Sequence, residues 1–285
     1  MRASRGHEAN RWIGLAPSLL WLGVVLLLPL GFIIAVSFAE RGLHGGVQWR
    51  FGLENYRRAL DPLYFPVYAR SFLMAAVTTA LCLLIGYPVA YAIALRVNPR
   101  WKQALLVLSI LPFWTSFLLR TYAWMFLLRA EGFVNTMLLT LGVIERPISW
   151  LLYSDFAVVV GQVYGELPFA ILPLYVALER VDVRVIEAAM DLGANRRQVF
   201  WRVVVPLTRP GIITALVLVF IPSLGAFITP DLLGGAKSAM LGTVIQNQFV
   251  QRNPPMGSAL SVLLILAVLA LLVMAWRAAG VKARQ

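Results

Sequence analysis

Six apolar blocks divide this sequence, and each is long enough to cross a lipid bilayer as a helix. About 20 helical residues span the hydrocarbon core of a bilayer. Backbone groups inside that core must satisfy their own hydrogen bonds, as they do in an α-helix. The sequence therefore predicts an all-α membrane protein with six transmembrane helices in one domain. The predicted spans are approximately 12–38, 71–95, 104–128, 156–178, 211–229 and 257–276.

The composition agrees with a multispanning protein. Hydrophobic residues make up 60% of the chain and charged residues 13%, whereas soluble domains carry about 25% charged residues. The net charge of +12 does not indicate a nucleic-acid partner, because the Lys and Arg residues flank the apolar blocks. The single cysteine, Cys82, excludes a disulfide framework, and His7 and His44 stand apart in polar flanks. We expect no metal site and no catalytic residues.

The Lys and Arg residues also indicate the orientation of the chain. They are more numerous in the N-terminus, the second loop, the segment 180–209 and the C-terminus than in the other three loops. The positive-inside rule then places both termini and the segment 182–206 in the cytoplasm.

The segment 182–206 is a long basic polar stretch between apolar blocks, and it reads locally as two short helices. Asp182 is a favourable N-cap for the first helix, and Gly193 can end it in the left-handed conformation. Asn195, with Gln198 three residues later, has the spacing of a capping box that begins the second helix. The prolines at 206 and 210 close the unit, because proline lacks the N–H that an interior helical bond needs.

Two charged residues, Arg120 and Glu166, stand inside predicted spans. Ionisable groups at membrane depth are costly, so they pair with one another or face water. Two interpretations remain open: a structural pair, or contacts with freed carbonyls, on one side, and a Glu166 carboxylate facing a cationic solute on the other. The remaining candidates for a substrate pathway are three aromatic side chains that can attract a cation and one carboxylate near the outer mouth: Trp114, Tyr122, Phe227 and Asp231.

The segment 182–206 resembles the Glu-Ala-Ala (EAA) loop of ABC-importer permeases. The residues that match the pattern are Glu187, Ala188, Ala189, Gly193, Val203, Val205 and Pro206. The resemblance implies a MetI-like, type I importer fold in which a cytoplasmic coupling helix docks on a separate ATPase subunit. The implied coupling residues are Glu187, Ala188, Ala189, Asp191, Gly193 and Asn195.

The likeness extends over nearly the whole chain from the first loop onward. It is carried by the segments 61–65, 86–88, 112–115, 119–122, 167–169, 173–175 and 231–236, and these segments look like PotB-type permeases of spermidine/putrescine importers. Glu166 departs from that pattern, in which an apolar residue is expected. The implied substrate is a polyamine. The alternatives are an opine, another amine or amino-acid derivative, a phosphonate or ferric ion.

The resemblance also implies the partners. They are a second, PotC-like permease, two ATPase subunits that bind ATP and Mg, a periplasmic substrate-binding protein and membrane lipid. The chain itself would hold no cofactor and would lie in the bacterial inner membrane. An ion-coupled secondary carrier is the main competing interpretation, but such carriers usually show inverted repeats, and no clear repeat is visible. A membrane enzyme would need a nucleophile or metal constellation within the spans, and none is visible either.

Overall fold

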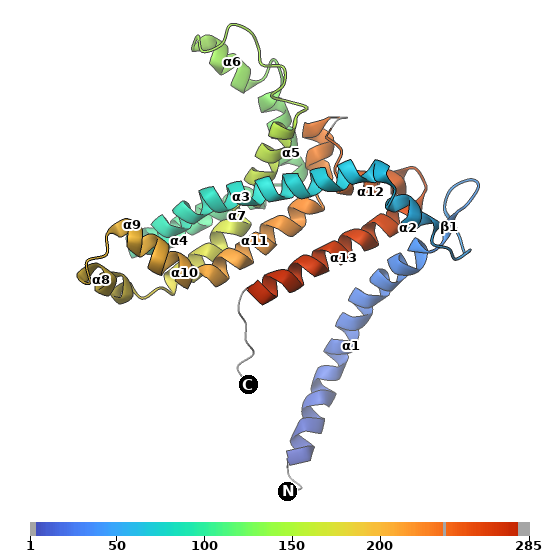
Figure 1. Cartoon of the computed structure of the whole chain (residues 1–285), viewed down its shortest axis with the longest axis horizontal. Helices are drawn as coiled ribbons and strands as arrows, with labels where there is room; N and C mark the ends of the chain where they lie inside the picture. Colours follow the sequence, from blue (N-terminus) through green and yellow to red (C-terminus); the bar gives the residue numbers. More distant parts are fainter. Residues whose placement is uncertain (1–3, 236–237, 279–285) are drawn as a thin grey trace. The chain divides into compact units, whose positions relative to one another are not determined.

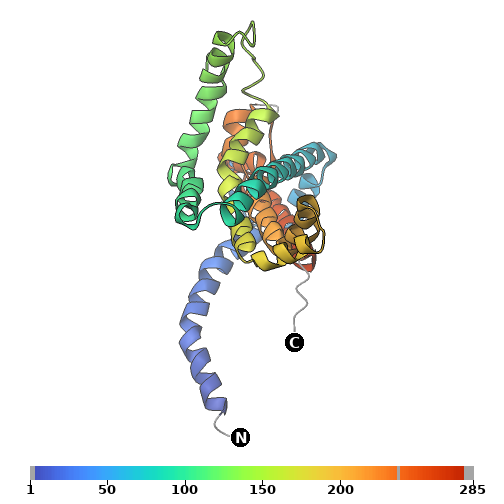
Figure 2. The ribbon, with the colours of Figure 1, turned by 90° about the vertical axis from the view of Figure 1, so that its left-hand side faces the viewer.

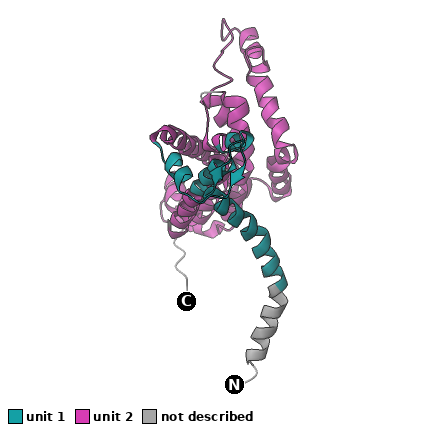
Figure 3. Ribbon diagram, turned by 90° about the vertical axis from the view of Figure 1, so that its right-hand side faces the viewer, with its two compact units in different colours: residues 1–61, 245–265 teal, residues 62–244, 266–285 magenta. Residues whose placement is uncertain are grey.

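The computed structural model describes residues 4–235 and 238–278. The chain divides into two compact units (Figure 3), one formed by residues 1–61 and 245–265 and the other by residues 62–244 and 266–285. Arg2, Lys237, Lys282 and Arg284, which contribute to the predicted orientation, lie outside the described residues.

In the first unit, the segment that follows a long helix donates hydrogen bonds at the C-terminal end of that helix. Helix α1 (Ser4–Ser37) is followed by the short antiparallel pair β1 (Glu40–Arg41) and β2 (Val47–Gln48) and by α2 (Glu54–Ala59). Asn55 Nδ2 donates to the carbonyls of Ser37 and Ala39 at 3.0 and 2.7 Å. These bonds satisfy carbonyl groups that the end of a helix leaves without partners.

The β1–β2 hairpin is held by the turn that precedes α13 (Pro254–Ala278). Gly46 N donates to the carbonyl of Arg252 at 2.9 Å, and Arg41 Nη2 donates to the carbonyl of Gln251 at 3.0 Å. The hairpin was not predicted. Its turn contains Gly45 and Gly46, both with positive φ, which is a recognisable hairpin signal.

Three helices form the core of the second unit: α3 (Phe65–Leu95), α7 (Asp155–Glu179) and α11 (Arg209–Leu224). They lie against one another along their lengths (Figure 1). Their shared core is apolar, with side chains such as Cys82, Leu174 and Val219 fully buried.

Small residues allow these helices to approach closely. A Cβ added at Gly86 of α3 would lie 3.3 Å from Ala170 Cβ of α7. A Cβ added at Gly211 of α11 would lie 2.9 Å from the carbonyl oxygen of Pro173 and closer still to Ala177 Cβ. Because lipid is as apolar as leucine, helices in a membrane associate through this kind of close packing.

The remaining elements connect these helices or flank them. They are η1 (Pro62–Tyr64), α4 (Pro99–Ile110), η2 (Leu111–Trp114), α5 (Phe117–Leu128), α6 (Phe133–Thr140), α8 (Val183–Asp191), α9 (Arg196–Val199), η3 (Phe200–Val204), α10 (Val205–Leu207), η4 (Pro230–Gly234), α12 (Leu241–Val250) and α13 (Pro254–Ala278).

Two predicted spans are not straight helices. The block at 104–128 bends by 87° between Pro99–Trp114 and Phe117–Thr140 (Figure 2). The bend follows η2, which contains Pro112, and Thr115 is extended there. The helix expected over 211–229 ends at Leu224, and the segment before it bends by 67° at Thr208. By length and composition, the described residues contain four helices able to cross a membrane, or up to six if each bent pair is one span.

The close approach of α11 to α7 leads to a stability prediction. Gly211→Leu places a side chain where α11 meets Pro173 and Ala177. Overpacking of this kind costs about 1–3 kcal/mol, so we expect a lower melting temperature in detergent. Gly23→Leu is the control, because nothing lies within 4 Å of a Cβ at Gly23. Equal melting temperatures for the two variants would contradict the packing described here.

Candidate functional site

The segment 182–206 folds as the sequence predicts, and its caps explain why. Asp182 is the N-cap of α8, and its side chain accepts from Arg184 N at 2.9 Å. Gly193 follows the helix with φ +85°. Gly193 N donates to the carbonyl of Met190 at 2.9 Å, and Ala194 N donates to that of Ala189 at 3.1 Å. This pair of bonds is a Schellman motif, which ends a helix at a left-handed residue.

The second short helix begins with the predicted capping box. Gln198 N donates to Asn195 Oδ1, and Asn195 N donates to Gln198 Oε1, both at 2.9 Å. The chain is therefore turned sharply between α8 and α9 by bonds that are local in sequence. These local bonds fix the shape of the elbow between the two helices.

Helix α8 has two different sides. Glu187, Ala188 and Asp191 are exposed, whereas Ala189 is partly buried against the core of the unit, together with Ile186. Gly193 and Asn195 are also exposed. All of the expected coupling residues except Ala189 are therefore accessible at the surface.

Aromatic contacts and a hydrogen bond connect the elbow to α3. The ring of Phe200, at the start of η3, meets the rings of Tyr87 and Tyr91, each at a centroid distance of 5.7 Å. The Thr208 hydroxyl, at the bend before α11, lies 2.8 Å from the Tyr87 hydroxyl. These contacts attach the segment after α9 to α3, and the continuous chain attaches it to α11.

The two charged residues of the predicted pathway lie on adjacent helices but do not form an ion pair. Within the described residues, no Arg120 nitrogen lies within 4.0 Å of a Glu166 oxygen. Arg120 Nε and Nη1 and Glu166 Oε2 are buried without a hydrogen-bond partner in the described chain. In this conformation the two groups therefore make no direct ion pair, and the structural interpretation and the interpretation with a cationic solute both stay predictions.

Arg120 lies against aromatic rings instead. Its guanidinium carbon is 5.5 Å from the centroid of Phe113 and 5.8 Å from that of Phe117. Phe113 in turn meets Phe169 of α7 edge-to-face at 5.1 Å. The sequence did not predict these aromatic partners, because it fixes the depth of Arg120 but not the direction of its side chain.

The other four predicted pathway residues are exposed. Trp114, in η2, is 79% exposed, and Tyr122 is also exposed. Phe227 is exposed at its side chain, while its carbonyl accepts from Asp231 N at 3.0 Å. Asp231 is exposed in η4.

Sequence reasoning missed a polar residue one helical turn from Glu166. Gln162 is 3% exposed; its Oε1 accepts from Thr78 Oγ1 at 2.8 Å, and its Nε2 donates to the carbonyl of Ser223 at 3.5 Å. It therefore joins α7 to α3 and to the end of α11. The sequence contained a signal for Gln162, because this polar residue stands in an otherwise apolar block four residues before Glu166 and so shares a helix face with it.

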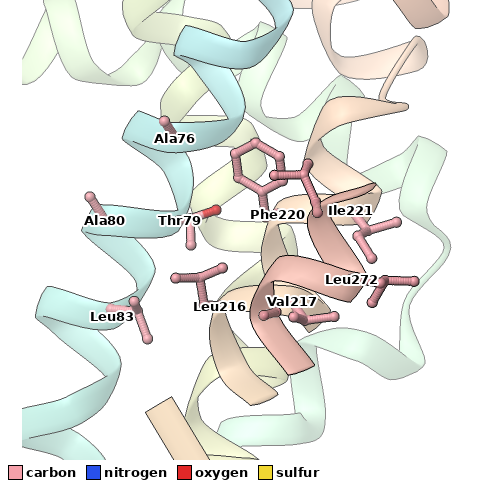
Figure 4. Close-up of a pocket in the computed structure, with 11 residues that line it drawn as sticks. Ala76, Thr79, Ala80, Leu83, Leu216, Val217, Phe220, Ile221 and Leu272 are labelled. Carbon is pink, nitrogen blue, oxygen red and sulfur yellow. The ribbon is translucent and has the colours of Figure 1, made fainter. Parts of the chain in front are cut away.

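An apolar hollow next to α3 and α11 does not suit the passage of a charged solute. It has a volume of about 310 Å³ and lies between α3, α11 and the second half of α13 (Figure 4). Thr79 is its one hydroxyl-bearing lining residue among those described, and that hydroxyl already donates to the carbonyl of Ala75 at 2.7 Å. A cation entering this hollow would lose its hydration without gaining polar partners.

A family model described as "Binding-protein-dependent transport system inner membrane component" matches residues 83–282. The chain belongs to this family. It is similar to the spermidine/putrescine transport system permease protein PotB of Haemophilus influenzae, with 43% identity over 259 residues and 90% of each chain covered. It is thus an inner-membrane permease subunit of a binding-protein-dependent ABC importer.

Solved structures agree on the fold. A chain in the crystal structure of a bacterial ABC transporter involved in alginate import is similar, with a TM-score of 0.69, 17% identity and 98% of each chain covered. A chain of the MetNI methionine ABC transporter is similar with a TM-score of 0.55 and 18% identity, covering 79% of this chain and 100% of that one. The predicted MetI-like permease fold is confirmed.

The capping box gives a local prediction. Asn195→Ala removes the side chain that accepts from Gln198 N, and loss of an N-cap costs about 1 kcal/mol. We expect amide hydrogen exchange in α9 to become roughly fivefold faster, measured by mass spectrometry. Arg202→Ala, an exposed change just after α9 in η3, is the control. The same exchange rate in Asn195→Ala and the wild type would contradict the role of the cap.

Proposed function

We propose that this permease forms half of the translocation pathway of an importer for a small cationic solute, most consistent with spermidine or putrescine. The observation that carries the proposal is the 43% identity to PotB over 90% of the chain. A polyamine also suits a pathway with a carboxylate, Glu166, and aromatic faces at membrane depth. The other half of the pathway would come from a second, PotC-like permease.

We propose further that both termini and the α8–α9 elbow face the cytoplasm, where two ATPase subunits bind ATP and Mg. The exposed Glu187, Ala188 and Asp191 would seat in an ATPase groove, and Gly193 and Asn195 would keep the elbow in shape. The contacts of Phe200 and Thr208 with Tyr87 support this coupling, because they tie the elbow to α3. A periplasmic binding protein would deliver the solute to the other face.

For a cationic substrate, both ATP hydrolysis and the membrane potential would drive import. Inward movement of one positive charge gains about 2.3 kcal/mol per 100 mV of inside-negative potential. ATP hydrolysis would therefore supply direction and the reset of the transporter in addition to concentrating the solute.

The coupling proposal is tested by two substitutions in the elbow. Glu187→Ala removes an exposed charge from α8, and Gly193→Asp forces a side chain into a left-handed position with φ +85°. We expect both variants to insert normally but to lose ATP-driven uptake of spermidine into proteoliposomes. Glu145→Ala, an exposed change outside the elbow, should transport normally. Wild-type uptake in both elbow variants would rule out the coupling role.

The substrate proposal is tested at Glu166. Glu166→Gln keeps the shape and removes the charge, and a hydrogen bond to a charged group is worth about 1.5–3 kcal/mol. We expect the KM for spermidine to rise roughly tenfold or more, while the exposed Glu145→Gln leaves it unchanged. Unchanged uptake with a lower melting temperature would instead assign Glu166 a structural role. Mass spectrometry of the solute held by the cognate binding protein identifies the substrate independently.

A further inference from the structure

A second, larger hollow lies beneath the elbow. It is an open hollow with a volume of about 730 Å³, and it is lined by the C-terminal end of α3, by α8, and by α9 with the start of η3. These elements meet at the end of the bundle where α3 finishes (Figure 1). The expected coupling residues Glu187 and Asp191 are not among its lining residues.

The charge of this hollow is positive and uncompensated. Arg96 of α3 and Arg196 and Arg197 of α9 line it, and no Asp or Glu appears among its described lining residues. Within the described chain, none of the three guanidinium groups lies within 4.0 Å of a carboxylate oxygen. Arg96 lies over the ring of Tyr91 at 5.4 Å, which holds its charge at the edge of the hollow. Such a cluster favours an anion with several acceptor oxygens.

The part of the lining that comes from α8 is apolar and only partly covered. Val183, Ile186 and Met190 are spaced to share one face of α8, and all three line the hollow. Val183 is 52% exposed and Met190 is 42% exposed. An inorganic anion would satisfy the arginines but would leave this apolar face in water.

The position of the hollow, like its charge and its apolar lining, limits which ligand could bind there. Its α3 wall, from Tyr87 to Arg96, is the last part of a helix long and apolar enough to cross the membrane. Tyr87 and Tyr91 suit the zone between lipid headgroups and acyl chains. Basic pockets between membrane helices at the cytoplasmic face bind anionic headgroups. The chemistry required is therefore an anionic headgroup joined to an apolar body at the membrane surface.

We propose that this hollow binds an anionic phospholipid. Its phosphate would lie against Arg96, Arg196 and Arg197, and its glycerol and upper acyl chain would cover the apolar face of α8. The lipid would join α9 to the end of α3 and so stiffen the elbow that transmits force from the ATPase. The inference rests on the proposed cytoplasmic position of the elbow, but not on the identity of the transported solute.

The test uses the assembled importer in nanodiscs of phosphatidylcholine with increasing phosphatidylglycerol. Native mass spectrometry counts the phosphatidylglycerol retained by the permease, and ATP hydrolysis is measured in parallel. We expect Arg96→Gln to reduce lipid retention about fivefold, and Gln at all three positions to abolish it. Lys at the same three positions should retain most of the binding. The matched control is Arg100→Gln with Arg184→Gln, because both arginines are exposed near the elbow and do not line the hollow.

Four outcomes would overturn the proposal. One is unchanged lipid retention when all three arginines are replaced by Gln. Another is an equal loss in the Arg100/Arg184 control. The third is loss of the ATPase subunits from the Gln variant while its lipid retention is unchanged, which would assign the arginines to the ATPase interface. Displacement of the lipid by millimolar inorganic phosphate would also overturn it and indicate a simple anion site. Because lipid retention needs no transported solute, failure of the polyamine assignment would leave this result unaffected.

Discussion

The absence of water in the bilayer core is the constraint on which this structure depends, because each polar group placed there needs a partner within the protein. Helices α3, α7 and α11 meet that demand for the backbone. Hydroxyl groups within the helices donate to carbonyls one turn earlier, as Thr79 does to Ala75 and Thr121 does to Phe117. With these groups satisfied, packing through Gly86 and Gly211 can bring the helices close together.

The elbow between α8 and α9 contacts the core of the unit through Val199, Ile186 and Ala189. Its shape comes from local bonds: the cap at Asp182, the Schellman turn at Gly193 and the capping box at Asn195. Its link to the bundle comes from Phe200 and Thr208 meeting Tyr87. A rigid lever with a definite attachment is what an importer needs if force from a separate ATPase is to move its membrane helices.

Local bonds shape the elbow, whereas packing between residues far apart in the sequence shapes the bundle. This difference explains which features the sequence could predict. The caps of α8 and α9 are set by residues a few positions apart, so their signals are complete in the sequence, and the structure confirms them. The relation of Arg120 to Glu166 was left open by the sequence, because hydropathy gives the depth of a side chain but not its rotation about the helix axis. The sharp bend near Pro112 had a visible signal, but its angle of 87° depends on tertiary packing. The hairpin at 40–48 carried a signal in Gly45 and Gly46 that was overlooked.

The buried polar atoms without partners also give the second unit two different sides. Arg120, Glu166, Ser223 and Thr229 hold such atoms, and they come from α5, α7, the end of α11 and the segment before η4. The hollow between α3, α11 and α13 is apolar instead, and its single hydroxyl is already bonded (Figure 4). A bundle surrounded only by lipid would have no physical reason to keep unpartnered charges on one side. The charges without partners therefore lie on α5 and α7, where the proposed pathway for a cation would run, whereas the hollow between α3, α11 and α13 is suited to lipid.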